Sequence, residues 1–115
     1  MLEGMIISAS AYDTVEDPLG REVYIDKDEE HAIREGKEIT YEELVNASEN
    51  ADGIWEGSEL DFYVKQMDDG TWWIIKVYTL GGVIYEVSTV IYAETRSDVD
   101  EYLENDINDI LRKIY

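Results

Sequence analysis

The chain has 115 residues, with 28 Asp and Glu against nine Lys and Arg, so its formal net charge is −19. That is far above the magnitude of about 2–8 that is usual for a small soluble domain. The absence of cysteine excludes a disulfide framework, a Cys-ligated zinc site and a thiol nucleophile. Nine Tyr, three Trp and a dense Ile/Val block nevertheless predict a folded core, and the length predicts a single domain over residues 1–115.

Two strands and a short helix are predicted at the start of the chain. Met5–Tyr12 and Glu22–Asp26 alternate between apolar and polar residues, as strands do, and a turn at 17–20 joins them. A short helix is predicted over residues 28–35, because polar residues open it and Gly36 ends it.

A second short helix begins at a capping box. In Thr40-Tyr41-Glu42-Glu43, the Thr and Glu side chains are placed to satisfy each other's backbone N–H groups. The helix is predicted to run to about Asn50, with Leu44 and Val45 facing inward. Residues 51–59, which include two glycines, are predicted to form a loop.

The clearest element is a hairpin over residues 60–79. Asp69-Gly70 is typical of a two-residue type I′ turn, in which both central residues take φ > 0. That turn pairs Val64 with Ile75, and a one-residue shift would undo the resulting separation of apolar from mixed side chains. The apolar face then consists of Leu60, Phe62, Val64, Trp73, Ile75 and Val77.

A strand over residues 83–94 completes a three-stranded antiparallel meander from about 60 to 94. A two-residue Gly81-Gly82 loop would place Glu86 beside Val77 on the apolar face. A three-residue loop instead pairs Lys76 with Glu86, so that opposite charges meet and no charge is buried. We therefore expect the three-residue loop.

A C-terminal helix is predicted over about 98–114, with Ser97 as its N-cap. Apolar residues recur along it at helical spacing, and these are Val99, Leu103, Ile107, Ile110 and Ile114. The predicted fold class is α+β: an antiparallel sheet, two short helices in the first half, and the C-terminal helix packed on the apolar face of the hairpin.

Catalytic and metal sites find little support in the sequence. His31 is the only histidine, and no Ser-His-Asp order, Gly-rich phosphate loop or His-based metal motif is present. Residues 26–30 begin like an EF-hand loop, but His31 and Lys37 stand where that loop requires Gly and Glu. We expect no catalytic residue, no cofactor and no dedicated metal site, and therefore a protein that is not an enzyme.

The acids are concentrated in two blocks. Residues 13–61 carry seventeen acids and four bases, residues 62–93 carry three and two, and residues 94–111 carry seven and one. On the C-terminal helix, like-charge pairs such as Asp100 with Glu104 each cost a few tenths of a kcal/mol. A helix selected only for stability would place Lys or Arg at some of these positions.

Rows of carboxylates can stand in for phosphates. Carboxylates on successive helical turns repeat every ~5.4 Å, and one DNA strand places a phosphate every ~3.4 Å along its axis. We expect the first-half acids to matter most, because residues 13–61 hold about two-thirds of the net charge. The predicted partner-binding residues are Asp26, Asp28, Glu29, Glu30, Glu35, Glu38, Glu42, Glu43, Glu49, Asp52, Glu56, Asp100, Glu101 and Glu104.

Other interpretations of these features stay open. A solvated acidic face that serves only solubility, or the surface of a halophilic protein, would have a similar net charge. The mixed face of the hairpin is a second candidate surface, because its side chains include types enriched in binding hot spots: Tyr63, Met67, Trp72, Ile74 and Tyr78. If no other element covers it, this face would suit docking of a partner or a homodimer.

In charge, size and lack of catalytic motifs, the chain resembles small, cysteine-free, acidic inhibitors of phages and mobile elements. These are anti-CRISPR proteins, antirestriction DNA mimics and uracil-glycosylase inhibitors. The resemblance lies in composition and assigns no residue a role. It implies a non-enzymatic inhibitor that binds the nucleic-acid-binding surface of a CRISPR effector or restriction enzyme as a nucleic-acid mimic.

Two alternatives accompany that interpretation. The chain also resembles bacterial immunity proteins, which neutralise a cognate nuclease toxin, and an acidic structural or regulatory module without mimicry would share its composition. The N-terminus has no signal-peptide pattern, and no apolar run approaches the roughly 18 residues of a membrane span. We expect a cytoplasmic protein, in the host cell if phage-encoded, that binds a basic protein and neither membranes nor nucleic acid directly.

Overall fold

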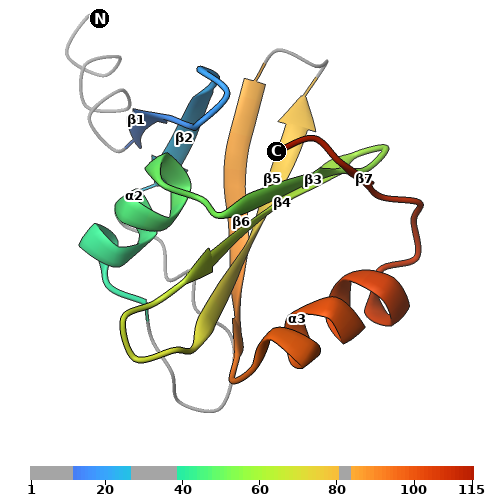
Figure 1. Cartoon of the computed structure of the whole chain (residues 1–115). Coiled ribbons are helices and arrows are strands. Elements are labelled where there is room, and N and C mark those ends of the chain that lie inside the picture. The colour runs from blue at the N-terminus through green and yellow to red at the C-terminus, as the bar shows by residue number, and fades with distance from the viewer. Residues whose placement is uncertain (1–11, 27–38, 81–83) are drawn as a thin grey trace, which may run out of the picture.

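The computed structural model describes residues 12–26, 39–80 and 84–115, and its architecture is α+β, as the sequence predicts (Figure 1). Helix α2 spans Tyr41–Glu49, and helix α3 (Arg96–Glu101) continues into a π-helical turn, η1 (Tyr102–Asp106). The strands are β1 (Tyr12–Glu16), β2 (Glu22–Asp26), β3 (Gly53–Glu56), β4 (Leu60–Gln66), β5 (Trp72–Leu80), β6 (Ile84–Ala93) and β7 (Arg112–Lys113).

These strands form one sheet in the order β1-β2-β6-β5-β4-β3-β7. Within the described residues, the pairing of β2 with β6 is parallel and the other pairings are antiparallel. The predicted meander is present as β4, β5 and β6.

The loop between β4 and β5 has three residues, 68–70, where the sequence predicted two. Gly70 takes φ 88°, and the Met67 N–H donates to the carbonyl oxygen of Thr71 at 2.7 Å. The Asp69 carboxylate also accepts from the backbone N–H of Thr71 at 2.9 Å. A three-residue loop with a left-handed Gly is the next most common hairpin connection after the two-residue turns. It shifts the register of the two strands by one residue.

The predicted pairing of Val64 with Ile75 is therefore wrong. Val64 faces Ile74, and Ile75 faces Tyr63. One side of the hairpin is formed by Phe62, Val64, Trp72 and Ile74, and the other by Tyr63, Trp73, Ile75 and Val77. All eight are buried, so both faces of the hairpin are apolar and covered. Of the mixed face predicted as a candidate patch, Tyr63, Trp72 and Ile74 are buried, and Tyr78 is 48% exposed.

The register between β5 and β6 also differs from the prediction. Glu86 faces Tyr78 rather than Lys76. An irregularity between Ile75 and Val77 then shifts the pairing. A bulge of this kind adds an unpaired residue to one strand and increases the local twist. Here the extra residue lies on β6, because Val87 and Val90 are three positions apart and yet belong to the same apolar cluster. The prediction assumed unbroken alternation along this strand and therefore missed the shift.

The C-terminal helix is shorter than the predicted 98–114 and begins earlier. Thr95, not Ser97, is the N-cap, because its hydroxyl accepts from the Asp98 N–H at 3.1 Å. The helical backbone ends at Asp106, and Ile107 is extended. After it, the chain crosses to the sheet edge, where the Ile114 N–H donates to the carbonyl oxygen of Ile54 at 2.9 Å.

β3 occupies part of the segment predicted as a loop over residues 51–59. It is held between β4 and the C-terminal residues, and Ile54 at its centre is fully buried. Pairing with the adjacent strand β4 and with the distant β7 thus overrides the two glycines that suggested a loop.

The predicted capping-box helix is present as α2. Thr40 accepts from the Glu43 N–H, and the Glu43 carboxylate accepts from the Thr40 N–H. β2 has its predicted bounds, but its partner is Tyr12–Glu16. The predicted strand Met5–Tyr12, apart from Tyr12, and the predicted helix at 28–35 lie outside the described residues.

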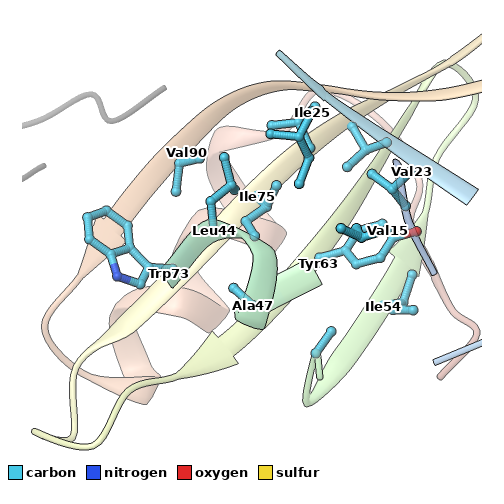
Figure 2. Close-up of a cluster of buried hydrophobic side chains, with 13 residues drawn as sticks. Val15, Val23, Ile25, Leu44, Ala47, Ile54, Tyr63, Trp73, Ile75 and Val90 are labelled. Carbon is cyan, nitrogen blue, oxygen red and sulfur yellow. The ribbon is translucent and has the colours of Figure 1, made fainter. Parts of the chain in front are cut away.

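Two apolar clusters lie on opposite faces of the sheet. On one face, Leu44 and Ala47 of α2 pack with the hairpin side that contains Tyr63 and Ile75 (Figure 2). On the other face, Val99 and Leu103 pack with the side that contains Phe62, Val64, Trp72 and Ile74. The C-terminal helix therefore packs on the sheet as expected, but through Trp72 and Ile74 rather than Trp73, Ile75 and Val77.

Within the residues that the structure describes, no helix has both the length and the apolar character needed to cross a membrane.

Candidate acidic binding surface

A group of acids lies on α3 and η1 and at Glu94, two residues before α3. We call it the α3–η1 surface, and its members are Glu94, Asp98, Asp100, Glu101, Glu104 and Asp106. All except Asp100, which is half-buried, are exposed. Val99 and Leu103 anchor the helix in the apolar cluster, and the Tyr102 ring meets Phe62 edge-on at 6.3 Å between centroids. Anchoring on that side turns the acids toward solvent.

A groove of about 250 Å³ opens on this surface. Among the described residues that line it are four carboxylates, two tyrosines and no Lys or Arg: Tyr92, Ala93, Glu94, Asp98, Glu101, Tyr102 and Asp106. The π-helical turn η1 contributes Tyr102 and Asp106 to this lining, and π-helical turns within helices often occur at functional sites. A positive side chain of a partner would find several carboxylates there.

Few cations in the described residues compensate these acids. Arg96 forms an ion pair with Asp100 at 3.2 Å and lies over the Trp72 ring. Arg112 pairs with Glu56 at 2.6 Å across β7 and β3. Lys113 lies over the Trp55 ring, 5.2 Å from its centroid. The Arg112 and Lys113 contacts tie the last strand to β3, so among these cations only Arg96 pairs with a member of the α3–η1 surface.

The predicted acids of α2 lie on the other side of the sheet (Figure 1). Glu42 and Glu49 are exposed, whereas the Glu43 carboxylate is engaged by the Thr40 N–H at 2.9 Å. The structure thus does not bring the α2 acids together with Asp100, Glu101 and Glu104.

Two other predicted residues take part in internal contacts. Asp52 accepts from the Gln66 N–H at 2.7 Å and lies 3.7 Å from the Lys65 ammonium. Glu56 pairs with Arg112, as described above. Asp26 is half-buried at the end of β2. The remaining predicted acids, Asp28, Glu29, Glu30, Glu35 and Glu38, lie outside the described residues, as does His31.

A loop that borders the α3–η1 surface is fixed by Asp109. Its carboxylate accepts from the Ser58 N–H at 2.8 Å and from the Ser58 hydroxyl at 3.0 Å, and these bonds lower the pKa of Asp109. Gly57 permits the close approach, because a Cβ there would lie 2.6 Å from the Asp109 carboxylate and 2.7 Å from the Leu60 carbonyl. Sequence reasoning missed this connection between distant loops.

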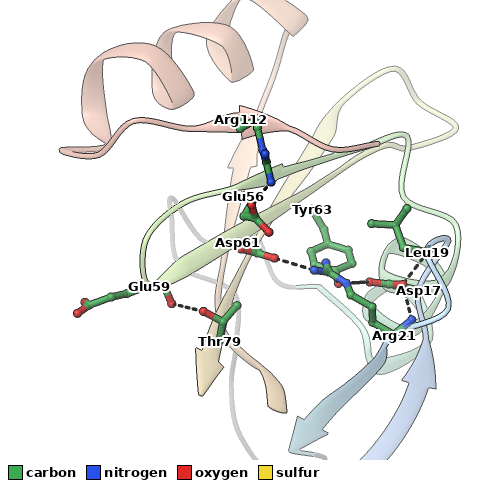
Figure 3. Close-up of polar contacts among 9 residues, drawn as sticks. All are labelled: Asp17, Leu19, Arg21, Glu56, Glu59, Asp61, Tyr63, Thr79 and Arg112. Atoms are coloured by element: carbon green, nitrogen blue, oxygen red, sulfur yellow. Dashed lines mark hydrogen bonds and ion pairs between the residues drawn. The ribbon is translucent and has the colours of Figure 1, made fainter. Parts of the chain in front are cut away.

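Sequence reasoning also missed a buried polar cluster of Asp17, Arg21, Asp61 and Tyr63 (Figure 3). The Arg21 guanidinium donates to Asp17 at 2.8 Å, to Asp61 at 3.0 Å and to the Tyr63 hydroxyl at 2.8 Å. The Tyr63 hydroxyl donates to Asp17. The guanidinium carbon also lies 4.3 Å from the centroid of the Tyr85 ring. The available signal was a charged residue, Asp61, beside the apolar Phe62-Tyr63-Val64 run of the same strand.

Burial and hydrogen bonding act differently on the two acids of this cluster. Burial alone would raise the pKa of Asp17, but hydrogen bonds from Tyr63 and Arg21 outweigh it and lower that pKa. For Asp61, burial outweighs the effect of Arg21, and its pKa is raised. Burial and the bond to Asp17 raise the pKa of Tyr63, so its hydroxyl stays protonated.

The described residues contain no group of three or more His, Cys, Asp or Glu side chains placed to hold a metal ion. Comparison with protein-family models, with curated proteins and with solved structures found no match to this chain.

Proposed function

We propose that this chain is a non-enzymatic inhibitor that occupies the nucleic-acid-binding surface of a defence nuclease in the host cytoplasm. The target class is a CRISPR effector or a restriction enzyme, and surface carboxylates take the place of nucleic-acid phosphates. The observation that carries the proposal is the α3–η1 surface, where Asp98, Glu101 and Glu104 are exposed. The nearest cation on that helix, Arg96, is paired with Asp100.

Simple electrostatics supports this assignment. A surface dominated by one sign of charge raises the association rate with an oppositely charged partner by roughly 10–10³-fold, and the effect falls as ionic strength rises. Proteins that grip nucleic acid carry Lys and Arg in the groove that contacts phosphates. A small acidic protein therefore has the charge needed to enter such a groove, whereas nucleic acid itself would repel it.

The partner is expected to contact only one of the two groups of exposed acids. The sheet separates α2 from α3, so a single flat partner surface meets either the α2 acids or the α3–η1 surface. Sequence reasoning favoured the first-half acids. The described contacts favour α3–η1, because Asp52 and Glu56 already have internal cationic partners and Glu43 caps its own helix.

The direct test uses purified CRISPR effector nucleases and restriction endonucleases. Cleavage of a labelled DNA duplex is measured with and without the chain, together with duplex binding by fluorescence anisotropy. We expect cleavage by a target enzyme to fall, and the duplex and the chain to exclude each other. If both bind the enzyme at once without mutual weakening, nucleic-acid mimicry is wrong.

Matched variants identify the contact face. Glu101→Gln with Glu104→Gln removes two charges from the α3–η1 surface, and Glu42→Gln with Glu43→Gln removes two from α2. Gln at position 43 keeps the capping box, so both variants should fold. We expect the first pair to slow association with the target nuclease more than the second, most clearly at low salt. A larger effect of the α2 pair would move the contact to the first-half acids.

The same assay separates the nearest alternative. Inhibition of a toxin nuclease, with CRISPR effectors and restriction enzymes unaffected, would replace this proposal by an immunity protein. Absence of binding to every basic nuclease would instead favour an acidic structural or regulatory module.

A further inference from the structure

Asp61 is the incompletely bonded member of the buried cluster. Its side chain is only 1% exposed, and one carboxylate oxygen, Oδ2, accepts from Arg21 at 3.0 Å. The other oxygen, Oδ1, is buried without a hydrogen-bond partner among the described residues. An ionised oxygen held away from water without a donor carries a large desolvation penalty.

Asp17 takes most of the donors that the cluster offers. Its carboxylate accepts from the Leu19 and Arg21 backbone N–H groups at 2.9 Å, from the Arg21 guanidinium and from the Tyr63 hydroxyl. The Arg21 guanidinium therefore donates to both carboxylates, but Asp17 accepts more hydrogen bonds in total than Asp61 does. Asp61 accepts one side-chain hydrogen bond, from Arg21. The nearby Gly57 N–H donates to the Leu60 carbonyl oxygen at 2.9 Å and lowers the pKa of Asp61 less than Arg21 does.

The other groups that face Asp61 do not supply a second cation. Glu56 stands opposite it in the β3–β4 register and adds negative charge. The partner of Glu56 is Arg112, whose side chain is 75% exposed. On β5, the residue opposite Asp61 is the apolar Val77. The Tyr85 ring of β6 is uncharged and lies against the Arg21 guanidinium.

We propose that Asp61 binds a proton in the folded chain at a pH where exposed aspartates are ionised, so that folding is coupled to proton uptake at this site. The proton goes to Oδ1, while Oδ2 continues to accept from Arg21. The cluster then holds one positive and one negative charge, Arg21 and Asp17, and it joins the β1–β2 turn to β4. The raised pKa of Asp61 agrees with this assignment.

The sign of the effect follows from linkage. In the unfolded chain an aspartate titrates near its ordinary pKa of about 3.9. Because the folded pKa of Asp61 is raised, the folded state binds more protons, and Asp61 favours folding increasingly as pH falls toward about 4. Asp17 acts in the opposite sense, because its lowered pKa gives stability above about 4 that is lost at more acidic pH.

The first experiment is a carboxyl-carbon NMR titration of the intact wild-type chain, with Asp61 and Asp17 assigned through their own Cβ protons. We expect Asp61 to titrate above the ordinary aspartate range and Asp17 below it. Titration of Asp61 at or below about 4 would overturn the proposal. This measurement needs no substitution, so it does not depend on whether a variant folds.

The second experiment compares urea unfolding of wild type, Asp61→Asn and Asp17→Asn between pH 4 and pH 8. Relief of the overall charge repulsion is common to all three chains and cancels in the comparison. We expect the folding constant of wild type relative to Asp61→Asn to rise as pH falls. The ratio to Asp17→Asn should hold steady and decline only near the acid end. A ratio to Asp61→Asn that stays flat or falls would contradict proton uptake.

Discussion

Tyr63 connects the two kinds of interaction in this fold. Its ring is part of the apolar cluster under α2, and its hydroxyl both donates to Asp17 and accepts from Arg21. The polar cluster therefore links two segments of the chain, because Asp17 and Arg21 belong to the β1–β2 turn and Tyr63 belongs to β4. Sheet neighbours do not make this connection, since β6 and β5 lie between β2 and β4.

Tyr63→Phe should destabilise the chain by about 1–3 kcal/mol, because it leaves buried polar partners unsatisfied while keeping the ring. Tyr78→Phe is the matched control, since that side chain is 48% exposed and its change should stay within about 0.5 kcal/mol. The free energy of unfolding from urea titration at pH 7 checks both. Equal effects of the two substitutions would show that the hydrogen bonds of the Tyr63 hydroxyl contribute nothing to the free energy of unfolding.

Single residues show what the sequence could and could not predict about the candidate site. The exposure of Glu101 and Glu104 follows from their residue type and helical position. The ion pairs of Asp52 with Lys65 and of Glu56 with Arg112 could not be predicted from the sequence. Asp52 and Glu56 lie in a segment predicted as a loop, and Arg112 lies in a segment predicted as helix. Charge counts identify acids, but contacts decide which remain available to a partner.

At the scale of elements, local sequence patterns predicted the positions of α2 and β2 correctly, whereas they did not predict the strand register. The capping box placed α2, and the alternation of residues 22–26 placed β2. The hairpin register was wrong because helices cover both faces of the sheet. Alternation separates two registers only when one face is solvated. The C-terminal stripe failed for a related reason: Ile110 matches the helical period but is 92% exposed, and the chain turns to pair with β3.

Engineered disulfides test the hairpin register, and the chain has no native cysteine to interfere. The Thr79 N–H donates to the Glu59 carbonyl, so Leu60 and Tyr78 form the adjacent pair without backbone hydrogen bonds. Such pairs have Cα atoms about 4.5 Å apart, within the range of a disulfide. Leu60→Cys with Tyr78→Cys should therefore oxidise readily.

The control for that disulfide is Leu60→Cys with Thr79→Cys, the pair that the sequence-derived register would place opposite each other. In the observed register these side chains point to opposite faces and should stay reduced. Thiol titration and mass spectrometry after mild oxidation distinguish the two variants. Faster oxidation of the control pair would contradict the observed register and support the two-residue turn predicted from the sequence.

At the scale of the whole molecule, the sheet divides the charge. The α2 acids and the α3–η1 surface lie on opposite faces, and the buried Arg21 is withdrawn from the surface by Asp17 and Asp61. The chain therefore carries exposed carboxylates on both sides of the sheet. A net charge of −19 on 115 residues also acts on the fold itself, because like charges repel more strongly in the compact state than in the extended chain.

Salt should consequently stabilise this protein. Raising the ionic strength from 0.1 M to 1 M shortens the Debye length from about 10 Å to about 3 Å, which screens repulsion between surface carboxylates. We expect the urea midpoint to rise with NaCl. The triple variant Glu49→Gln, Glu101→Gln and Glu104→Gln removes three charges, including the i,i+3 pair on α3–η1. It should be more stable than wild type at low salt and should respond less to NaCl. An identical salt response of the two chains would mean that repulsion among these acids does not limit the fold, and a wild-type midpoint that falls with salt would mean that attractive ion pairs dominate.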